Sequence, residues 1–129
     1  MKNIIIWVLR VFIGLVALML LYPGITWSFI PETNLLSHDI VVNSALGMNM
    51  LKSAMGTGLF ATSIFMFLFV FKGEKWFLPS FMIMAIFLLI RVISLAMDGS
   101  HKMIIVGIII EIFSLIAMWG LNKLQNEKS

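Results

Sequence analysis

Residues 90–113, which read IRVISLAMDGSHKMIIVGIIIEIF, place a cation and an anion inside two apolar stretches that flank a short polar turn. Arg91 lies seven residues before Asp98, so the two side chains share one helix face with Ser94, about 10 Å from the turn. Glu111 lies about 15 Å down the next helix. Because an arginine side chain extends over several ångströms, Arg91 and Glu111 are within reach of each other. A guanidinium and a carboxylate placed in this way can pair, hold an anion or exchange a proton.

Two further polar side chains, Asn49 and Lys52, lie near the outer end of an earlier apolar segment. A lone charge at the centre of a spanning helix costs about 2.5–3.5 kcal/mol, so we expect charges at similar depth to face one another inside the protein. The predicted polar cluster, a hypothetical ligand-binding site, consists of Arg91, Glu111, Asp98, Lys52, Ser94 and Asn49. A buried ion pair is weak evidence of stability, because desolvation can exceed the attraction. Two interpretations therefore stay open: the pair fixes helix register, or it serves a ligand.

Other kinds of site have no support in the sequence. The chain has no cysteine, which excludes disulfides, thiolate metal sites and cysteine nucleophiles. His38 and His101 are isolated, and both fall in predicted outer loops. The net charge of +3 is spread over segment ends and is not gathered into a basic run. We therefore expect no metal, no cofactor, no catalytic residue and no nucleic-acid partner.

The elements that must position these side chains are apolar and long. The 129 residues are 61% hydrophobic and 12% charged, whereas a soluble domain is about half apolar and a quarter charged. Apolar segments occupy about 4–22, 48–71, 77–97 and 103–121, and each has the roughly 20 residues that a spanning helix needs. Backbone groups in hydrocarbon must be satisfied internally. We predict an all-α, integral membrane four-helix bundle that forms a single domain over residues 1–129, with an outer connection at 23–47 that begins where Pro23-Gly24 ends the first helix.

Basic residues are distributed unevenly over the segment ends. With a cytoplasmic N-terminus, the cytoplasmic side carries Lys2, Arg10, Lys72, Lys75, Lys123 and Lys128, and the opposite side keeps Lys52 and Lys102. Positive charge favours cytoplasmic loops. We therefore predict that both termini are cytoplasmic, and that the polar cluster lies in the outer half of the membrane.

Two further patterns fit a membrane bundle. Aromatic residues near segment ends predict an interfacial belt; they are Trp7, Trp27, Trp76, Trp119 and Tyr22. Small residues repeat at every fourth position of the second segment and predict close helix packing; they form the rows Ser53, Thr57, Ala61 and Ala54, Gly58, Thr62.

Three pieces of the chain carry a family resemblance. Residues 49–56 read NMLKSAMG, similar to Asn/Glu-x-x-Arg-x-x-x-Gly, and residues 91–99 read RVISLAMDG, similar to Arg-x-x-Ser/Gly-x-x-x-Asp-Gly. Glu111 stands where the family tends to carry a glutamate. On these residues, within about 45–121, the chain resembles the small bacterial membrane proteins of domain of unknown function 4345 and, on architecture alone, DoxX-like proteins. Lys52 replaces the family's arginine and offers a point charge in place of a planar fork. The resemblance implies the four-helix fold and a place in the bacterial inner (cytoplasmic) membrane, and it brings no known activity.

The sequence favours a binding function over a reaction. We predict an outward-opening cavity for a lipid-like or anionic small ligand, with Arg91 and Lys52 as anion contacts and Glu111 as the counter-charge, or else an accessory subunit. The expected partners are membrane lipid, a small amphiphilic ligand, and another membrane protein or a second copy of the chain. The alternatives are a small proton-coupled transporter that uses Glu111, and a membrane enzyme acting on a lipid through acid–base groups such as Asp98 and His101.

Overall fold

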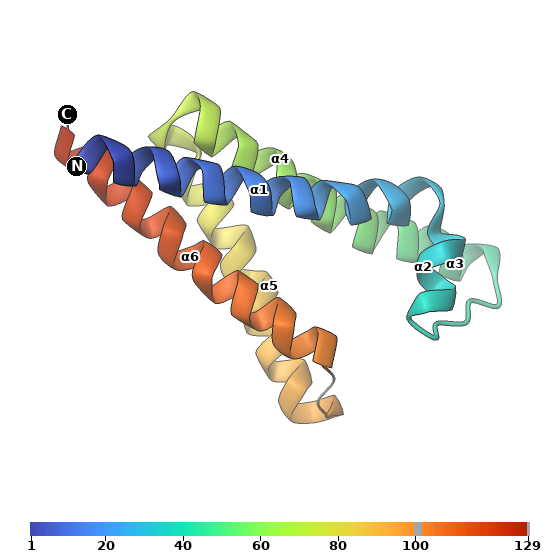
Figure 1. The fold of residues 1–129 in the computed structure, drawn as a ribbon. Helices are drawn as coiled ribbons and strands as arrows, with labels where there is room; N and C mark the ends of the chain where they lie inside the picture. The colour runs from blue at the N-terminus through green and yellow to red at the C-terminus, as the bar shows by residue number, and fades with distance from the viewer. Residues whose placement is uncertain (100–101, 129) are drawn as a thin grey trace. The chain divides into compact units, whose positions relative to one another are not determined.

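The structure is a computed structural model that describes residues 1–99 and 102–128, and every regular element in this part of the chain is helical (Figure 1). The elements are α1 (Lys2–Phe29), α2 (Pro31–Ser37), α3 (Ala45–Leu51), a π-helical segment η1 (Lys52–Gly56), α4 (Thr57–Lys72), a 3₁₀ turn η2 (Glu74–Trp76), α5 (Phe77–Asp98) and α6 (Lys102–Lys128). Four helical stretches are long and apolar enough to cross a membrane: Lys2–Phe29, Ala45–Lys72, Glu74–Asp98 and Lys102–Glu127. The described chain is therefore all-α and has the spans of a small multi-pass membrane protein, as predicted.

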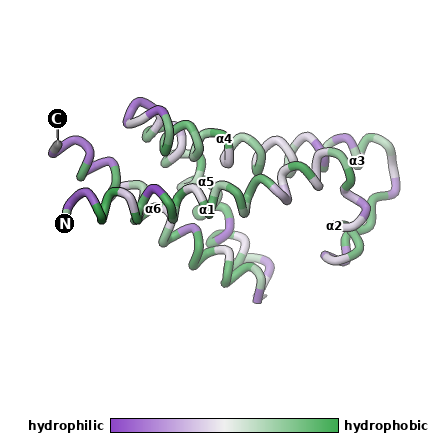
Figure 2. Tube along the Cα trace, turned by 45° about the horizontal axis from the view of Figure 1, so that its top comes forward, coloured by the Kyte–Doolittle hydropathy of each residue, from purple (hydrophilic) through white to green (hydrophobic). Residues whose placement is uncertain are grey.

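These helices consist mostly of hydrophobic residues along their length (Figure 2). Large side chains such as Leu15, Leu89 and Phe113 are more than half exposed. Soluble proteins rarely expose apolar patches on this scale, so the exposed faces are suited to lipid.

The first helix does not end at Pro23-Gly24, and that prediction is wrong. Helix α1 runs through both residues to Phe29. Two hydroxyls bind carbonyls in this turn: Thr26 Oγ1 donates to the Pro23 oxygen over 3.1 Å, and Ser28 Oγ donates to the Gly24 oxygen over 2.7 Å. Such local hydroxyl bonds are one way in which spanning helices tolerate proline. Gly24 does not end the helix but lets α1 and α4 approach each other closely, because a Cβ there would lie 2.9 Å from the backbone nitrogen of Phe60.

The chain divides into two compact units, and each is described by itself. Unit 1 comprises Met1–Leu15 and Phe65–Ser129, and unit 2 comprises Val16–Ile64. In unit 2, Trp27, Leu35 and Leu59 form a buried cluster. Helix α2 is joined to α1 by a hydrogen bond of 2.8 Å from Asn34 Nδ2 to Thr26 Oγ1.

The outer connection is accordingly shorter than the predicted 23–47. It covers residues 30–44, and α2 occupies its first half. Proline at the first position of α2 begins this helix, and Ser44 ends the connection by accepting a hydrogen bond of 3.0 Å from the Gly47 backbone N–H as the cap of α3. Pro31 and Leu35 are buried, so the connection packs onto the helices of unit 2 as a strap.

Helices α1 and α4 approach closely in unit 2, and of the predicted rows of small residues only Thr62 is buried. Ser53, Ala54 and Thr57 are exposed. The contact instead uses Gly56, where a Cβ would lie 2.1 Å from Ser28 Oγ. Farther along α4 it includes the buried Ser63, whose hydroxyl donates a hydrogen bond of 2.7 Å to the Ala17 oxygen of α1. A π-helical turn holds an additional residue, so a face counted with a regular period of four is not continuous across Lys52–Gly56.

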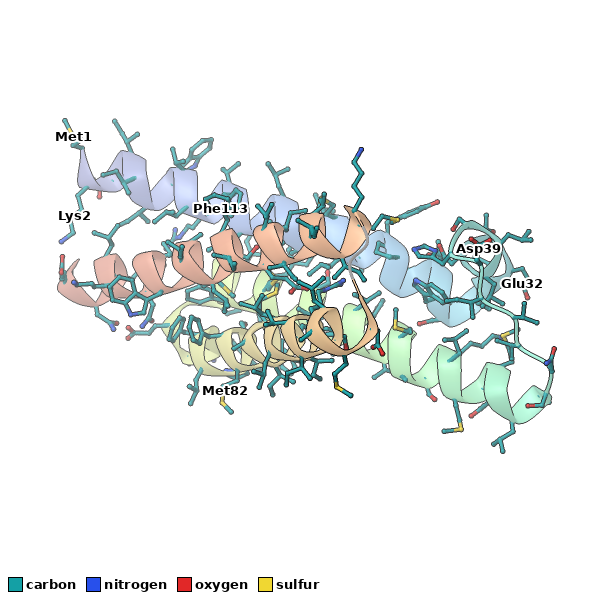
Figure 3. The ribbon with its side chains drawn as sticks, turned by 90° about the horizontal axis from the view of Figure 1, so that it is seen from below. Met1, Lys2, Glu32, Asp39, Met82 and Phe113 are labelled. Atoms are coloured by element: carbon teal, nitrogen blue, oxygen red, sulfur yellow. The ribbon has the colours of Figure 1, made fainter. Side chains whose placement is uncertain are left out.

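Unit 1 contains the α5–α6 hairpin, the end of α4 and the start of α1. Met66, Met84 and Met118 are almost completely buried in its core, where the flexible thioether side chain fills irregular space. Lys2 Nζ lies 3.4 Å from Glu127 Oε2, so both chain ends lie at the same end of this unit (Figure 3). Helix α6 continues well past the predicted residue 121.

The predicted aromatic belt is partly wrong. Trp7, Tyr22 and Trp119 are more than half exposed, as side chains at a lipid interface would be, but Trp27 is only 4% exposed. The indole of Trp27 packs against Leu35 and Leu59, so it belongs to the core of unit 2.

Candidate functional site

The α5–α6 hairpin of unit 1 brings Arg91 and Glu111 together. Arg91 Nε donates a hydrogen bond of 2.6 Å to Glu111 Oε1. Gly99, with a φ of 94°, follows the last residue of α5 and allows the chain to turn back. The two charges therefore meet across neighbouring helices about two to three turns from the turn that joins them.

Gly107 provides the room for this contact, and sequence reasoning missed it. A Cβ at Gly107 would lie 3.1 Å from Arg91 Nη1 and 3.2 Å from Cζ. The guanidinium therefore lies against bare backbone one helical turn before Glu111 on the same face of α6. The only signal in the sequence is the spacing of four residues, which places Gly107 and Glu111 on one face of the helix.

The two charges differ in their exposure. The side chain of Glu111 is 9% exposed, whereas that of Arg91 is 36% exposed. Glu111 Oε2 is buried and has no hydrogen-bond partner among the residues that the structure describes. The nearby Ser114 is fully buried, but its hydroxyl already donates to the Ile110 oxygen over 2.7 Å.

The pair is therefore only half satisfied within the described residues. Arginine carries N–H donors on three nitrogens, and in this part of the chain only Nε of Arg91 is engaged. The terminal nitrogens can donate in a forked geometry that suits a carboxylate or a phosphate. The site thus combines unused donors on a partly exposed cation with an unused acceptor on a buried anion.

The other predicted residues are not in contact with this pair through any hydrogen bond or ion pair among the described residues. Ser94 is half-buried one turn from Arg91, and Asp98 is exposed at the end of α5. Asn49 is exposed and Lys52 is half-buried, and both belong to unit 2. Their part in a common cluster stays a prediction. His101 and the side chain of Lys128 lie outside the described residues.

A metal site is not found in the part of the chain that the structure describes, which contains no group of three or more His, Cys, Asp or Glu side chains able to hold an ion. His38 lies in the connection, where its Nδ1 is 2.8 Å from the Asn34 oxygen and 3.0 Å from Ser37 Oγ. Its ring also contacts that of Trp27, with centroids 5.7 Å apart. The ring thus has a local structural role in unit 2.

The fold and the pair define a class of protein: a small all-α protein with four helices long and apolar enough to cross a membrane, and with an ion pair between α5 and α6. No protein-family model, curated protein or solved structure matches the chain. The resemblance to domain of unknown function 4345 therefore stays a prediction, and the functional argument depends on the geometry of the site.

Proposed function

We propose that this protein holds an anionic, lipid-like ligand at Arg91 and Glu111, in the outer half of a four-helix bundle in the bacterial inner membrane. The observation that carries the proposal is the half-satisfied pair: Nε of Arg91 is bound to one carboxylate oxygen, and the other oxygen is buried without a donor. Groups that lack partners inside a membrane protein are costly, and a bound molecule would supply those partners.

The chemistry of the pair describes the ligand. The terminal nitrogens of Arg91 suit a phosphate or carboxylate that accepts two parallel hydrogen bonds. Glu111 Oε2 needs an O–H or N–H donor. A molecule with an acidic group next to a hydroxyl or amine, attached to an apolar tail, meets both requirements, and the tail would lie along the exposed apolar side chains of the spans.

Depth agrees with a headgroup ligand. Arg91 lies about 10 Å from the end of α5, and an arginine side chain can extend from that depth toward the polar layer. The excess of basic residues near the chain ends supports cytoplasmic termini, which would place Arg91 in the outer leaflet.

Native mass spectrometry of the full chain, purified in a mild detergent, tests the binding function. We expect a retained amphiphile in the wild type, its loss in Arg91→Ala, and partial retention in Arg91→Lys, which keeps the charge but not the fork. Lys123→Gln is the control, because it removes a cation that lies 5.1 Å from the ring centroid of Trp119, away from the pair. Equal retention by wild type and Arg91→Ala would refute the proposal.

Topology can be tested separately, because the chain has no cysteine. In intact cells, Ser37→Cys in the connection should react with a membrane-impermeant maleimide, whereas Glu127→Cys should react only after permeabilisation. The reverse pattern would place the Arg91–Glu111 pair in the inner leaflet.

The unpartnered oxygen of Glu111 also favours a second candidate, a small proton-coupled transporter. A carboxylate with a free acceptor inside a span is a group on which a proton can be carried. Liposomes loaded with the pH-sensitive dye pyranine and given a membrane potential would report proton entry, which Glu111→Gln should abolish. If wild-type and empty liposomes acidify at the same rate, this candidate fails.

A further inference from the structure

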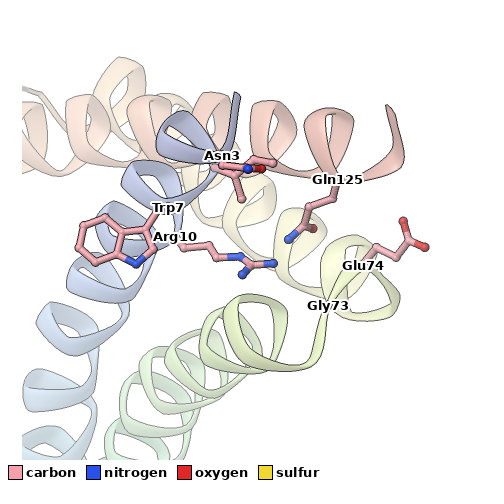
Figure 4. A pocket seen from close by; sticks show the side chains of 7 residues that line it. Asn3, Trp7, Arg10, Gly73, Glu74 and Gln125 are labelled. Atoms are coloured by element: carbon pink, nitrogen blue, oxygen red, sulfur yellow. The ribbon is translucent and has the colours of Figure 1, made fainter. Parts of the chain in front are cut away.

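A second polar site lies at the opposite end of unit 1 from the α5–α6 turn. It is a cleft of about 450 Å³ at the end that holds both chain termini (Figure 4). Small-molecule sites have volumes of about 300–1,000 Å³. The cleft is lined by Asn3, Ile6, Trp7, Arg10, Gly73, Glu74 and Gln125.

One wall is a polar stripe on α1. Asn3, Trp7 and Arg10 are spaced by four and three residues, so they share one face of the helix. Arg10 is about 12 Å along the helix from Lys2, and its side chain points into the space between the helices (Figure 4). Among the described residues Arg10 makes no ion pair, and the two pairs found there are Lys2–Glu127 and Arg91–Glu111. This wall therefore offers an exposed cation that has no ion-pair partner within the described residues.

The facing wall offers acceptors. The Oε1 atom of Gln125 on α6 is buried and receives no hydrogen bond from the described part of the chain. Glu74, in the turn between α4 and α5, carries a carboxylate at the rim that makes no ion pair within the described chain. Gly73 beside it has a φ of 97°, and a Cβ there would meet no atom within 4 Å, so the backbone at this edge leaves space for a ligand.

We propose that the cleft binds the phosphoethanolamine headgroup of a membrane phospholipid. The guanidinium of Arg10 takes the phosphate oxygens through charge-assisted hydrogen bonds. The ammonium donates to Gln125 Oε1, and Glu74, whose side chain points outward from the cleft, contributes a negative charge at the rim (Figure 4). Trp7, which is 67% exposed, covers the glycerol region, as indole rings do at membrane interfaces.

The donor and acceptor pattern selects this headgroup over its common alternatives. A phosphocholine headgroup has a quaternary nitrogen without N–H groups and cannot satisfy Gln125. A phosphoglycerol headgroup lacks the cation that Glu74 attracts, so its net negative charge would be repelled at the rim. The site is separate from the Arg91–Glu111 pair, and it depends on no assumption about that pair.

The test titrates delipidated full-length protein with phosphatidylethanolamine, phosphatidylcholine and phosphatidylglycerol of identical acyl chains, read out by native mass spectrometry. We expect about tenfold tighter binding of phosphatidylethanolamine than of phosphatidylcholine, which corresponds to about 1.4 kcal/mol. Gln125→Leu should bring this ratio close to one, and Glu74→Gln should raise the relative binding of phosphatidylglycerol. Arg10→Gln should lower binding of all three lipids.

Controls separate this site from general lipid binding and from loss of the fold. Lys102→Gln removes a cation at the other end of unit 1 and should leave the selectivity unchanged. If Arg10→Gln does not fold, the ratio of phosphatidylethanolamine to phosphatidylcholine binding by Gln125→Leu still tests the site. We expect this variant to fold, because it adds no buried charge. Equal binding of phosphatidylethanolamine and phosphatidylcholine by the wild type would overturn the proposal. Full competition by soluble phosphoethanolamine at the same concentration as the lipid would show that the acyl chains add nothing to binding, and it would overturn the assignment to a membrane lipid.

Discussion

Replacing the two members of the Arg91–Glu111 pair with leucine, singly and together, should give unequal losses of stability. Arg91→Leu leaves the carboxylate of Glu111 buried with both oxygens unpartnered. Breaking a buried pair from this side costs about 3–5 kcal/mol. Glu111→Leu instead leaves a guanidinium that is one-third exposed and free to extend toward the polar layer. A hydrogen bond to a charged group is worth about 1.5–3 kcal/mol, and partial exposure reduces this loss to about 1–2 kcal/mol.

The double replacement should recover most of the loss. Two leucines leave no uncompensated charge, and buried pairs replaced by apolar side chains are often neutral or stabilised. We expect the double variant to lie within about 1 kcal/mol of the wild type. That outcome would show that the pair adds little net stability to the hairpin.

Unfolding by sodium dodecyl sulfate in mixed micelles, followed by tryptophan fluorescence, gives the free energy of unfolding of each variant. The argument from exposure would be refuted if Glu111→Leu lost as much stability as Arg91→Leu. A double variant as unstable as the sum of the two single ones would show that the side chains do not interact energetically.

Two further predictions concern unit 2. Gly56→Ala should lower the free energy of unfolding by about 1–3 kcal/mol, because the added methyl group would meet Ser28 Oγ. Ser28→Gly in the same chain should recover part of this loss. A neutral Gly56→Ala would contradict the close helix contact. Trp27→Ala should lower the free energy of unfolding by about 3–5 kcal/mol, since the indole is 96% buried against Leu35 and Leu59. Trp119 is exposed, so Trp119→Ala should change this free energy little. Equal effects of the two replacements would count against the described core.

The spans were predictable because hydropathy acts over whole segments. About 20 apolar residues suffice to identify a span, and a misjudged end does not change the assignment. The contact of Arg91 with Glu111 was also predictable, since helix rise fixes depth and unlike charges at similar depth attract.

The local errors share one cause: a residue type can serve tertiary packing instead of local conformation. Pro23-Gly24 is a common helix end, but here the glycine permits the approach of α4. Trp27 has the residue type and the position near a segment end that are typical of a membrane interface, but the connection packs over it. The π-helical segment Lys52–Gly56 cannot be read from a pattern that assumes a regular helix, and it moved the packing face away from Ser53 and Thr57.

The cleft at the chain termini was missed for a different reason. Its residues come from three separate places in the sequence, and only the stripe on α1 has a recognisable spacing. Arg10 was interpreted as an orientation signal, which is a sufficient explanation when its neighbours are unknown. Gln125 carries no formal charge, and its significance lies in a buried oxygen that only the structure reveals.

The uninterrupted course of α1 through Pro23 has a consequence for the membrane around the protein. Its 28 residues extend about 42 Å, whereas the hydrocarbon layer is about 30 Å thick and the bilayer with its headgroups about 40–45 Å. Matching the hydrocarbon by tilt alone would need about 44°, far more than the usual 20° or so. A membrane-spanning α1 would therefore have turns to spare in both polar layers, and we expect bilayers that differ in thickness by one helical turn to accommodate it without strain.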